Sequence, residues 1–254
     1  MNKKVIERNF SRYAHNYDSY ATVQRSVASA LLQELKNESF QRILELGCGT
    51  GAFTSLLKTR FPEASIIAVD FSAAMIAVAK EKLADSEVEF IVCDAELLNL
   101  EGPFDLISSN ACFQWFEDPE RAILRYKKML SPEGKICFSI FGPRTFNELN
   151  TILNSCFHNI SISVDGFIHA EKIKEIMQGY FTAVQVKDLH FSEEFLSLKD
   201  LLYKIKYTGT RGEGAVGDVV FNRKALMDLE SQYLKQFKKI IASYEVFICQ
   251  ARAG

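Results

Sequence analysis

The sequence predicts an α/β fold with a doubly wound, mostly parallel sheet that is covered by helices on both faces. From residue 41 onwards, apolar runs of strand length alternate with helical patterns. A glycine-rich turn follows the first apolar run, and acidic residues end the second and third runs. Strands that alternate with helices form right-handed βαβ units, so neighbouring strands lie parallel and are buried on both faces.

The elements follow from apolar spacing and from breaker residues. The first helix is predicted over residues 24–34, where Val27, Leu31 and Leu35 recur at helical spacing. Five strands are predicted at 41–46, 65–69, 88–93, 104–109 and 134–141, with helices at 51–60, 72–84 and 118–130 between them. Pro62 and Pro132 end the first and last of these helices. Two further strands at 183–189 and 244–251 complete a seven-stranded sheet.

The 254 residues are expected to form one domain with a substantial core. Residues 1–40 would form N-terminal helices or a lid, and residues 41–141 would form the cofactor-binding half. A helical segment is predicted at 145–157. The connections 142–182 and 190–240 are interpreted as helical cap insertions on the substrate side, since long insertions in compact domains usually carry function.

Composition excludes several classes of protein. Thirty basic and 32 acidic residues give a net charge of −2, which argues against binding nucleic acid or an anionic membrane surface. The six cysteines are scattered, without C-x-x-C pairs or metal-ligand spacing, and no metal is expected. The N-terminus lacks an apolar signal region, and no segment reaches the ~18 apolar residues of a membrane span. We therefore expect a cytoplasmic protein.

The turn from Gly47 to Gly51 predicts a nucleoside pocket. Its glycines allow positive φ angles and a close approach of the backbone to a ligand, and the following helix points free N–H groups into the same space. The turn also fits the dinucleotide fingerprint G-x-G-x-x-A, so a dehydrogenase is an alternative, as is an unrelated α/β domain. Glu45, before the turn, and Asp94, after the third strand, favour a different cofactor from NAD.

An E-x-G-x-G-x-G loop with acids after strands two and three resembles the class I S-adenosylmethionine-dependent methyltransferases, whose fold is Rossmann-like. The resemblance implies that Asp70 binds the ribose hydroxyls, that Asp94 meets the adenine amino group and that the loop lies against the methionine part. The cofactor-binding residues that the resemblance implies are Glu45, Gly47, Cys48, Gly49, Gly51, Asp70, Phe71, Met75, Asp94, Ala95 and Asn110.

Further motifs resemble the malonyl-acyl carrier protein O-methyltransferases of biotin synthesis. They are the opening segment 10–24, with the form F-S-R-x-A-x-x-Y-D-x-x-A-x-x-Q, the segments 44–51, 109–115 and 138–143, and more loosely 206–210. The resemblance implies transfer of a methyl group from S-adenosylmethionine to the free carboxylate of a malonyl thioester on acyl carrier protein, or on CoA. Methylation of another small acid, such as an aconitate-like compound, and a binding module without turnover are the alternatives.

A carboxylate acceptor is already ionised at neutral pH, so the site needs no general base. Arg144, or Arg12, is predicted to hold one carboxylate oxygen, because guanidinium binds carboxylates well. Trp115 is predicted to form a rigid wall of the site beside the transferred methyl group. The alternative is that its side chain only packs in the core. Arg12, Tyr17 and Gln24 would close over both ligands. Substrate contacts are assigned to Gln24, Gln114, Phe141 and Lys206. We expect a monomer that meets its carrier through a basic patch. The candidate patches are 125–128, Lys172 with Lys174, Lys199 with Lys204 and Lys206, and Lys235 with Lys238 and Lys239.

Overall fold

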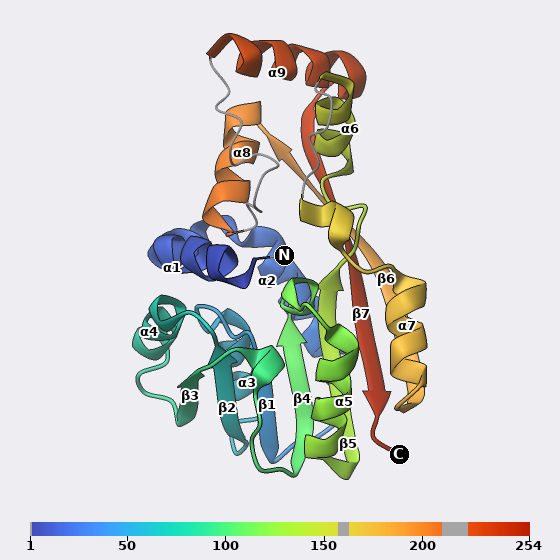
Figure 1. The fold of residues 1–254 in the computed structure, drawn as a ribbon. Coiled ribbons are helices and arrows are strands. Elements are labelled where there is room, and N and C mark those ends of the chain that lie inside the picture. The colour runs from blue at the N-terminus through green and yellow to red at the C-terminus, as the bar shows by residue number, and fades with distance from the viewer. Residues whose placement is uncertain (1, 157–162, 210–222) are drawn as a thin grey trace.

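A computed structural model describes residues 2–156, 163–209 and 223–254 (Figure 1). The sheet has seven strands in the order β3-β2-β1-β4-β5-β7-β6. They are β1 (Arg42–Leu46), β2 (Ser65–Asp70), β3 (Val88–Val92), β4 (Phe104–Asn110), β5 (Leu130–Phe141), β6 (Thr182–Phe195) and β7 (Ile240–Arg252). β1 to β5 are parallel, and β7 runs antiparallel to β5 and β6. The strand order therefore reverses between β1 and β4, which is where ligands bind in open α/β sheets.

Helices cover both faces of this sheet. One face packs against α5 (Pro119–Met129) and α7 (Ala170–Gln178), and the other against α2 (Thr22–Gln33) and α3 (Ala52–Arg60). The short helix α4 (Ala73–Lys82) follows β2 and packs on the second face. Asp118 caps α5 by accepting a hydrogen bond from the backbone N–H of Arg121 at 2.9 Å, and Pro119 occupies the first turn.

A cap of helices lies beyond the carboxyl ends of the parallel strands (Figure 1). It contains α1 (Lys3–Tyr20), α6 (Asn147–Cys156), α8 (Leu198–Tyr207) and α9 (Arg223–Phe237), which share an apolar cluster with the start of β7. None of the helices in the described part of the chain is long and apolar enough to cross a bilayer. The cap closes the edge of the sheet at which the predicted site residues emerge.

The predicted seven-stranded, mostly parallel sheet is confirmed. β6 and β7 are longer than the predicted 183–189 and 244–251, because the two strands pair with each other from Thr182 to Phe195. Helix α7 was not predicted. It buries Ile173 and Met177 against the sheet, so this part of 142–182 covers a sheet face instead of lying on the substrate side. Residues 157–162 and 210–222 of the two insertions lie outside the described residues.

Candidate active site

The glycine-rich turn after β1 has the backbone conformation that its sequence predicts. Gly47, Gly49 and Gly51 have φ angles of +67°, +55° and +79°, which favour glycine. A Cβ at Gly47 would lie 2.4 Å from the sulfur of Cys112, whereas a Cβ at Gly49 would meet nothing within 4 Å. The turn is therefore packed on one side at Gly47 and faces open space at Gly49.

Asp70, at the end of β2, fixes the neighbouring turns. Its Oδ2 accepts a hydrogen bond from the N–H of Gly49 at 2.9 Å, and its Oδ1 accepts one from the N–H of Ser72 at 2.8 Å. Burial raises the pKa of Asp70 from 3.8 to about 6, although these two N–H donors oppose the shift. A buried carboxylate whose pKa is raised in this way gains from additional donors such as hydroxyl groups.

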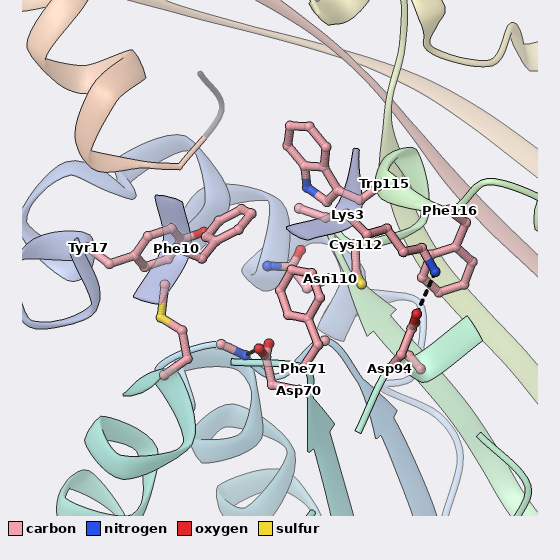
Figure 2. Close-up of a pocket in the computed structure, with 15 residues that line it drawn as sticks. Lys3, Phe10, Tyr17, Asp70, Phe71, Asp94, Asn110, Cys112, Trp115 and Phe116 are labelled. Carbon is pink, nitrogen blue, oxygen red and sulfur yellow. Dashed lines mark hydrogen bonds and ion pairs between the residues drawn. The ribbon is translucent and has the colours of Figure 1, made fainter. Parts of the chain in front are cut away.

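A hollow of about 640 Å³ lies beside this turn and is here called the adenosine pocket. Figure 2 shows Asp70 and Phe71 on its floor, with Phe10 and Tyr17 reaching in from α1. Most of the cofactor-binding residues that the sequence predicts come together here, namely Gly47, Gly49, Asp70, Phe71, Met75, Asp94, Ala95 and Asn110. Trp115 also lines this pocket. Its aromatic floor and two acids suit a nucleoside.

A second hollow of about 400 Å³ lies against the same turn and is here called the amino-acid pocket. It shares Tyr17, Gly47, Gly49 and Asn110 with the adenosine pocket, and it is also lined by Glu45, Cys48 and Arg25. The two hollows therefore form one continuous site around the turn. Gly51, by contrast, serves as the N-cap of α3 and does not line either hollow.

Glu45 is a buried carboxyl group without adequate partners. Burial raises its pKa from 4.5 to about 8; the hydroxyl of Thr54 lowers it somewhat and the charge of Asp70 adds to the rise. Its Oε2 atom has no hydrogen-bond partner in the described part of the chain. A buried polar atom without a partner is costly, so Glu45 is poised to accept a hydrogen bond from a ligand in the amino-acid pocket.

Helix α1 is held across the site by polar contacts near both of its ends. Lys3 forms an ion pair of 2.7 Å with Asp94 (Figure 2). It forms a second ion pair with Glu96. Asp18, near the other end of the helix, accepts a hydrogen bond from the hydroxyl of Thr50 at 2.6 Å. The same carboxylate forms an ion pair of 2.6 Å with Lys82, which lies on α4.

Aromatic side chains fill the space between these polar contacts. The ring of Phe10 lies 6.1 Å from that of Tyr17, 6.2 Å from Phe71 and 5.9 Å from Trp115, measured between ring centroids. Burial raises the pKa of the Tyr17 hydroxyl, and the charge of Asp70 adds to the rise. Tyr17 is therefore a neutral donor at physiological pH. Helix α1 covers the adenosine pocket, which is the position that the sequence predicted for a lid.

A third hollow, of about 370 Å³, lies beyond Trp115 and is here called the acyl cavity. Trp115 separates it from the adenosine pocket, and Gln24 separates it from the amino-acid pocket. The cavity brings together three residues to which the sequence analysis assigned substrate contacts, namely Gln24, Gln114 and Phe141. Its remaining lining residues are Thr145, Phe146, Val164, Phe167, Lys204, Thr208 and Tyr244.

Three other predicted substrate residues lie elsewhere. The guanidinium group of Arg144 is bound by Glu245 and lies 3.5 Å from Asp188, and it does not line any of these three hollows. Arg12 is exposed and packs over the ring of Tyr13. The ammonium group of Lys206 lies 5.2 Å from the ring centroid of Tyr207, also outside the cavity. Carboxylate binding by Arg144 or Arg12 thus stays a prediction that this arrangement does not support.

Sequence reasoning did not anticipate that Lys3, Arg25 and Lys204 line the three hollows. The expected docking patch of Lys199, Lys204 and Lys206 is wrong for Lys204, because the side chain of Lys204 is only 5% exposed. The signal was present: Lys204 follows Leu201 by three positions and so falls on the apolar face of α8 with Leu198 and Ile205. For Lys3, whose partners lie more than ninety residues away, no local signal exists.

Comparisons with known proteins agree with this geometry. The model of a family described as "Methyltransferase domain" matches residues 44–138. A malonyl-acyl-carrier protein O-methyltransferase of Paenibacillus sp. (strain JDR-2) is 31% identical, over 98% of each chain. This chain belongs to the malonyl-acyl-carrier protein O-methyltransferase family. A member of that family from Priestia megaterium is 44% identical, over 59% of this chain and 56% of its own length.

The solved structures that resemble this chain share its fold. The N-methyltransferase NodS from Bradyrhizobium japonicum, solved in complex with S-adenosylhomocysteine, superposes with a TM-score of 0.57 at 16% identity, over 98% of each chain. This likeness confirms the class I methyltransferase fold predicted from the sequence, including the sheet that carries the glycine-rich turn. Within the described residues, no group of three or more His, Cys, Asp or Glu side chains is placed to bind a metal ion.

Proposed function

We propose that this protein transfers a methyl group from S-adenosylmethionine to the free carboxylate of a malonyl group carried on acyl carrier protein. The observation that carries the proposal is that three hollows adjoin one another, since Trp115 lines both the adenosine pocket and the acyl cavity, and Gln24 lines both the acyl cavity and the amino-acid pocket. Family membership supports malonyl-acyl carrier protein as the acceptor.

The residues around the turn fit S-adenosylmethionine. Asp70 would accept from the ribose hydroxyls and Asp94 would lie at the adenine end. The unpartnered Oε2 of Glu45 would accept from the ammonium group of the methionine part, and the guanidinium of Arg25 would meet its carboxylate. The open space at Gly49 would let the ligand lie close to the backbone of the turn. When bound, the cofactor supplies an electrophilic methyl group on a sulfonium ion and leaves as a neutral thioether.

The protein's own residues have to position the acceptor and exclude water. A malonyl carboxylate is ionised at neutral pH, so no side chain needs to remove a proton. Trp115 packs edge-on against Phe10 and Phe167, with centroids 5.9 and 5.7 Å away, and this contact fixes its ring between the hollows. Orientation of the two reactants can lower a barrier by about 7–11 kcal/mol, which is the main catalytic contribution that this site offers.

The proposal is tested by measuring methyl transfer from labelled S-adenosylmethionine to malonyl-acyl carrier protein, malonyl-CoA, malonate and aconitate. We expect malonyl-acyl carrier protein to have the highest kcat/KM. Transfer only to a free acid, or to none of the four acceptors, would contradict the proposal. S-adenosylhomocysteine should raise the melting temperature, whereas NAD should not.

Asp70→Ala provides the variant arm of this test. It should remove most of the melting-temperature shift that S-adenosylhomocysteine causes, because the carboxylate both meets the ligand and holds the turn. Asp105→Ala is a matched control, since Asp105 also accepts hydrogen bonds from two backbone N–H groups, those of Gln41 and Arg42, both at 3.0 Å. Asp105 lies at the start of β4, at the end of the sheet opposite the glycine-rich turn. Its loss should therefore leave the ligand-induced shift in melting temperature unchanged.

A further inference from the structure

The acyl cavity contains a buried cation that no predicted role explains. Lys204 reaches into it from α8, and its side chain is only 5% exposed. Its ammonium group contacts the carboxylate of Glu193 on β6 and the hydroxyl of Thr22 on α2. Burying an ammonium group costs free energy, and ionisable groups in such surroundings cluster at functional sites.

The partners of Lys204 leave it able to bind another group. An ammonium group has three N–H donors, and the contacts with Glu193 and Thr22 use two of them. Glu193, in turn, does not depend on Lys204 alone, because it also accepts hydrogen bonds from Thr22 and, at 3.0 Å, from the hydroxyl of Tyr244. The ammonium group also lies 5.7 Å from the ring centroid of Tyr244. Among the described residues no further hydrogen-bond acceptor meets Lys204, so one N–H donor is available to an anion in the cavity.

Two amide oxygens in the same cavity also lack hydrogen-bond partners among the described residues. The Oε1 atoms of Gln24 and Gln114 are buried without a hydrogen bond in the described part of the chain. Gln114 has a fixed orientation, because its Nε2 donates to the carbonyl of Ala111 at 2.7 Å. Its free oxygen thus suits a ligand N–H, such as an amide of a thioester arm, whereas the amide of Gln24 can turn to offer either atom.

Arg144 does not compete with Lys204 for this role. On β6, Arg144 pairs with Asp188, whereas Lys204 pairs with Glu193. These two carboxylates lie five positions apart on one uninterrupted stretch of the strand. Since successive side chains of a strand point to opposite faces, these carboxylates lie on opposite faces of the sheet. Lys204 is on the face that carries the cavity, and among the described residues it is the only cation that lines it.

We propose that Lys204 binds the carboxylate of the acyl group and selects acyl thioesters that end in a carboxylate. This assignment rests on the proposed function, and it places one carboxylate oxygen on the ammonium group while the other points toward Trp115 and Gln24. An ammonium group gripping only one oxygen leaves the second as the nucleophile. Uncharged acyl groups would leave the buried cation without its third partner and would bind weakly.

The test compares Lys204→Met, Lys204→Arg, Glu193→Gln and the double variant Lys204→Met/Glu193→Gln. We expect Lys204→Met to raise KM for malonyl-acyl carrier protein about 100-fold, with S-adenosylhomocysteine affinity within about twofold of wild type. Lys204→Arg should recover part of that loss. Glu193→Gln should lower KM about threefold, since it frees the ammonium group for the substrate. The double variant should keep the raised KM without the instability of an unpaired buried carboxylate.

Lys135→Met is the matched control, because Lys135 also forms a buried ion pair, at 2.7 Å with Glu38, but does not line the cavity. It should lower the melting temperature without changing KM. If Glu193→Gln raises KM as much as Lys204→Met, the pair is only structural and the proposal is overturned.

A binding measurement separates this inference from the proposed function. In calorimetry with S-adenosylhomocysteine present, wild type should bind malonyl-CoA at least about tenfold more tightly than acetyl-CoA, and Lys204→Met should lose that preference. Equal preference in both proteins overturns the role of Lys204. A wild-type protein that shows the preference but transfers no methyl group would instead count against the proposed function.

Discussion

Glu45→Gln should stabilise the ligand-free protein at alkaline pH while it weakens cofactor binding. The pKa of Glu45 rises from 4.5 to about 8 because the carboxyl group is buried. The folded protein therefore holds this proton more tightly than the unfolded chain does, so stability falls as pH rises from about 4.5 to 8. At 1.36 kcal/mol per pKa unit, the loss reaches about 4 kcal/mol at pH 8, of which about 2 kcal/mol accrues between pH 6 and 8.

Urea denaturation at pH 6, 7 and 8 measures this effect. Wild type should lose about 2 kcal/mol of unfolding free energy over that range from Glu45, with a few tenths more from Asp70, whose pKa of about 6 lies at its lower edge. Glu45→Gln should show only the smaller slope and be the more stable protein at pH 8. In calorimetry at the same pH, its affinity for S-adenosylmethionine should fall by about tenfold or more, because the ligand's ammonium group loses an anionic acceptor. A variant that is less stable than wild type at pH 8, or that keeps the full pH slope, would refute the reasoning.

Two further predictions concern the cap and the exposed arginine. Asp18→Ala removes the hydrogen bond to Thr50 and the ion pair with Lys82, so S-adenosylhomocysteine affinity should fall about five- to tenfold and amide exchange in α1 should accelerate. Glu7→Ala, at an exposed position of α1, is the control. Equal affinities in the two variants would show that the contacts of Asp18 do not contribute to cofactor binding. Arg144→Ala should lower the melting temperature, because the buried Glu245 loses its guanidinium partner, but change KM for malonyl-acyl carrier protein by no more than about threefold. A large rise in KM would instead indicate that Arg144 binds the carboxylate of the substrate.

Much of the cofactor site is local in sequence and was therefore predictable. Apolar runs, either alternating with polar residues or continuous, predict β1 to β5. The parallel arrangement brings the carboxyl ends of β1, β2 and β3 to the same edge of the sheet. Gly47, Gly49 and Asp70 sit within a few residues of those ends, so their convergence follows from topology alone. The positive φ angles of the glycines were implied by the residue type itself.

The acceptor side could not be predicted in the same way, because its chemistry depends on burial and on partners that are distant in the chain. Lys204 lies near Thr22 and Glu193, from three different elements, and only their packing turns a lysine of an amphipathic helix into a buried cation. Arg144 looked equally suitable in sequence, yet Glu245 holds it away from the hollows. The sequence by itself determined the sheet, the glycine-rich turn and the acids at the strand ends, since each depends on short-range pattern. Only the tertiary structure decided which cation faces the acyl cavity, because desolvation and ion pairing are set by contacts across the whole fold.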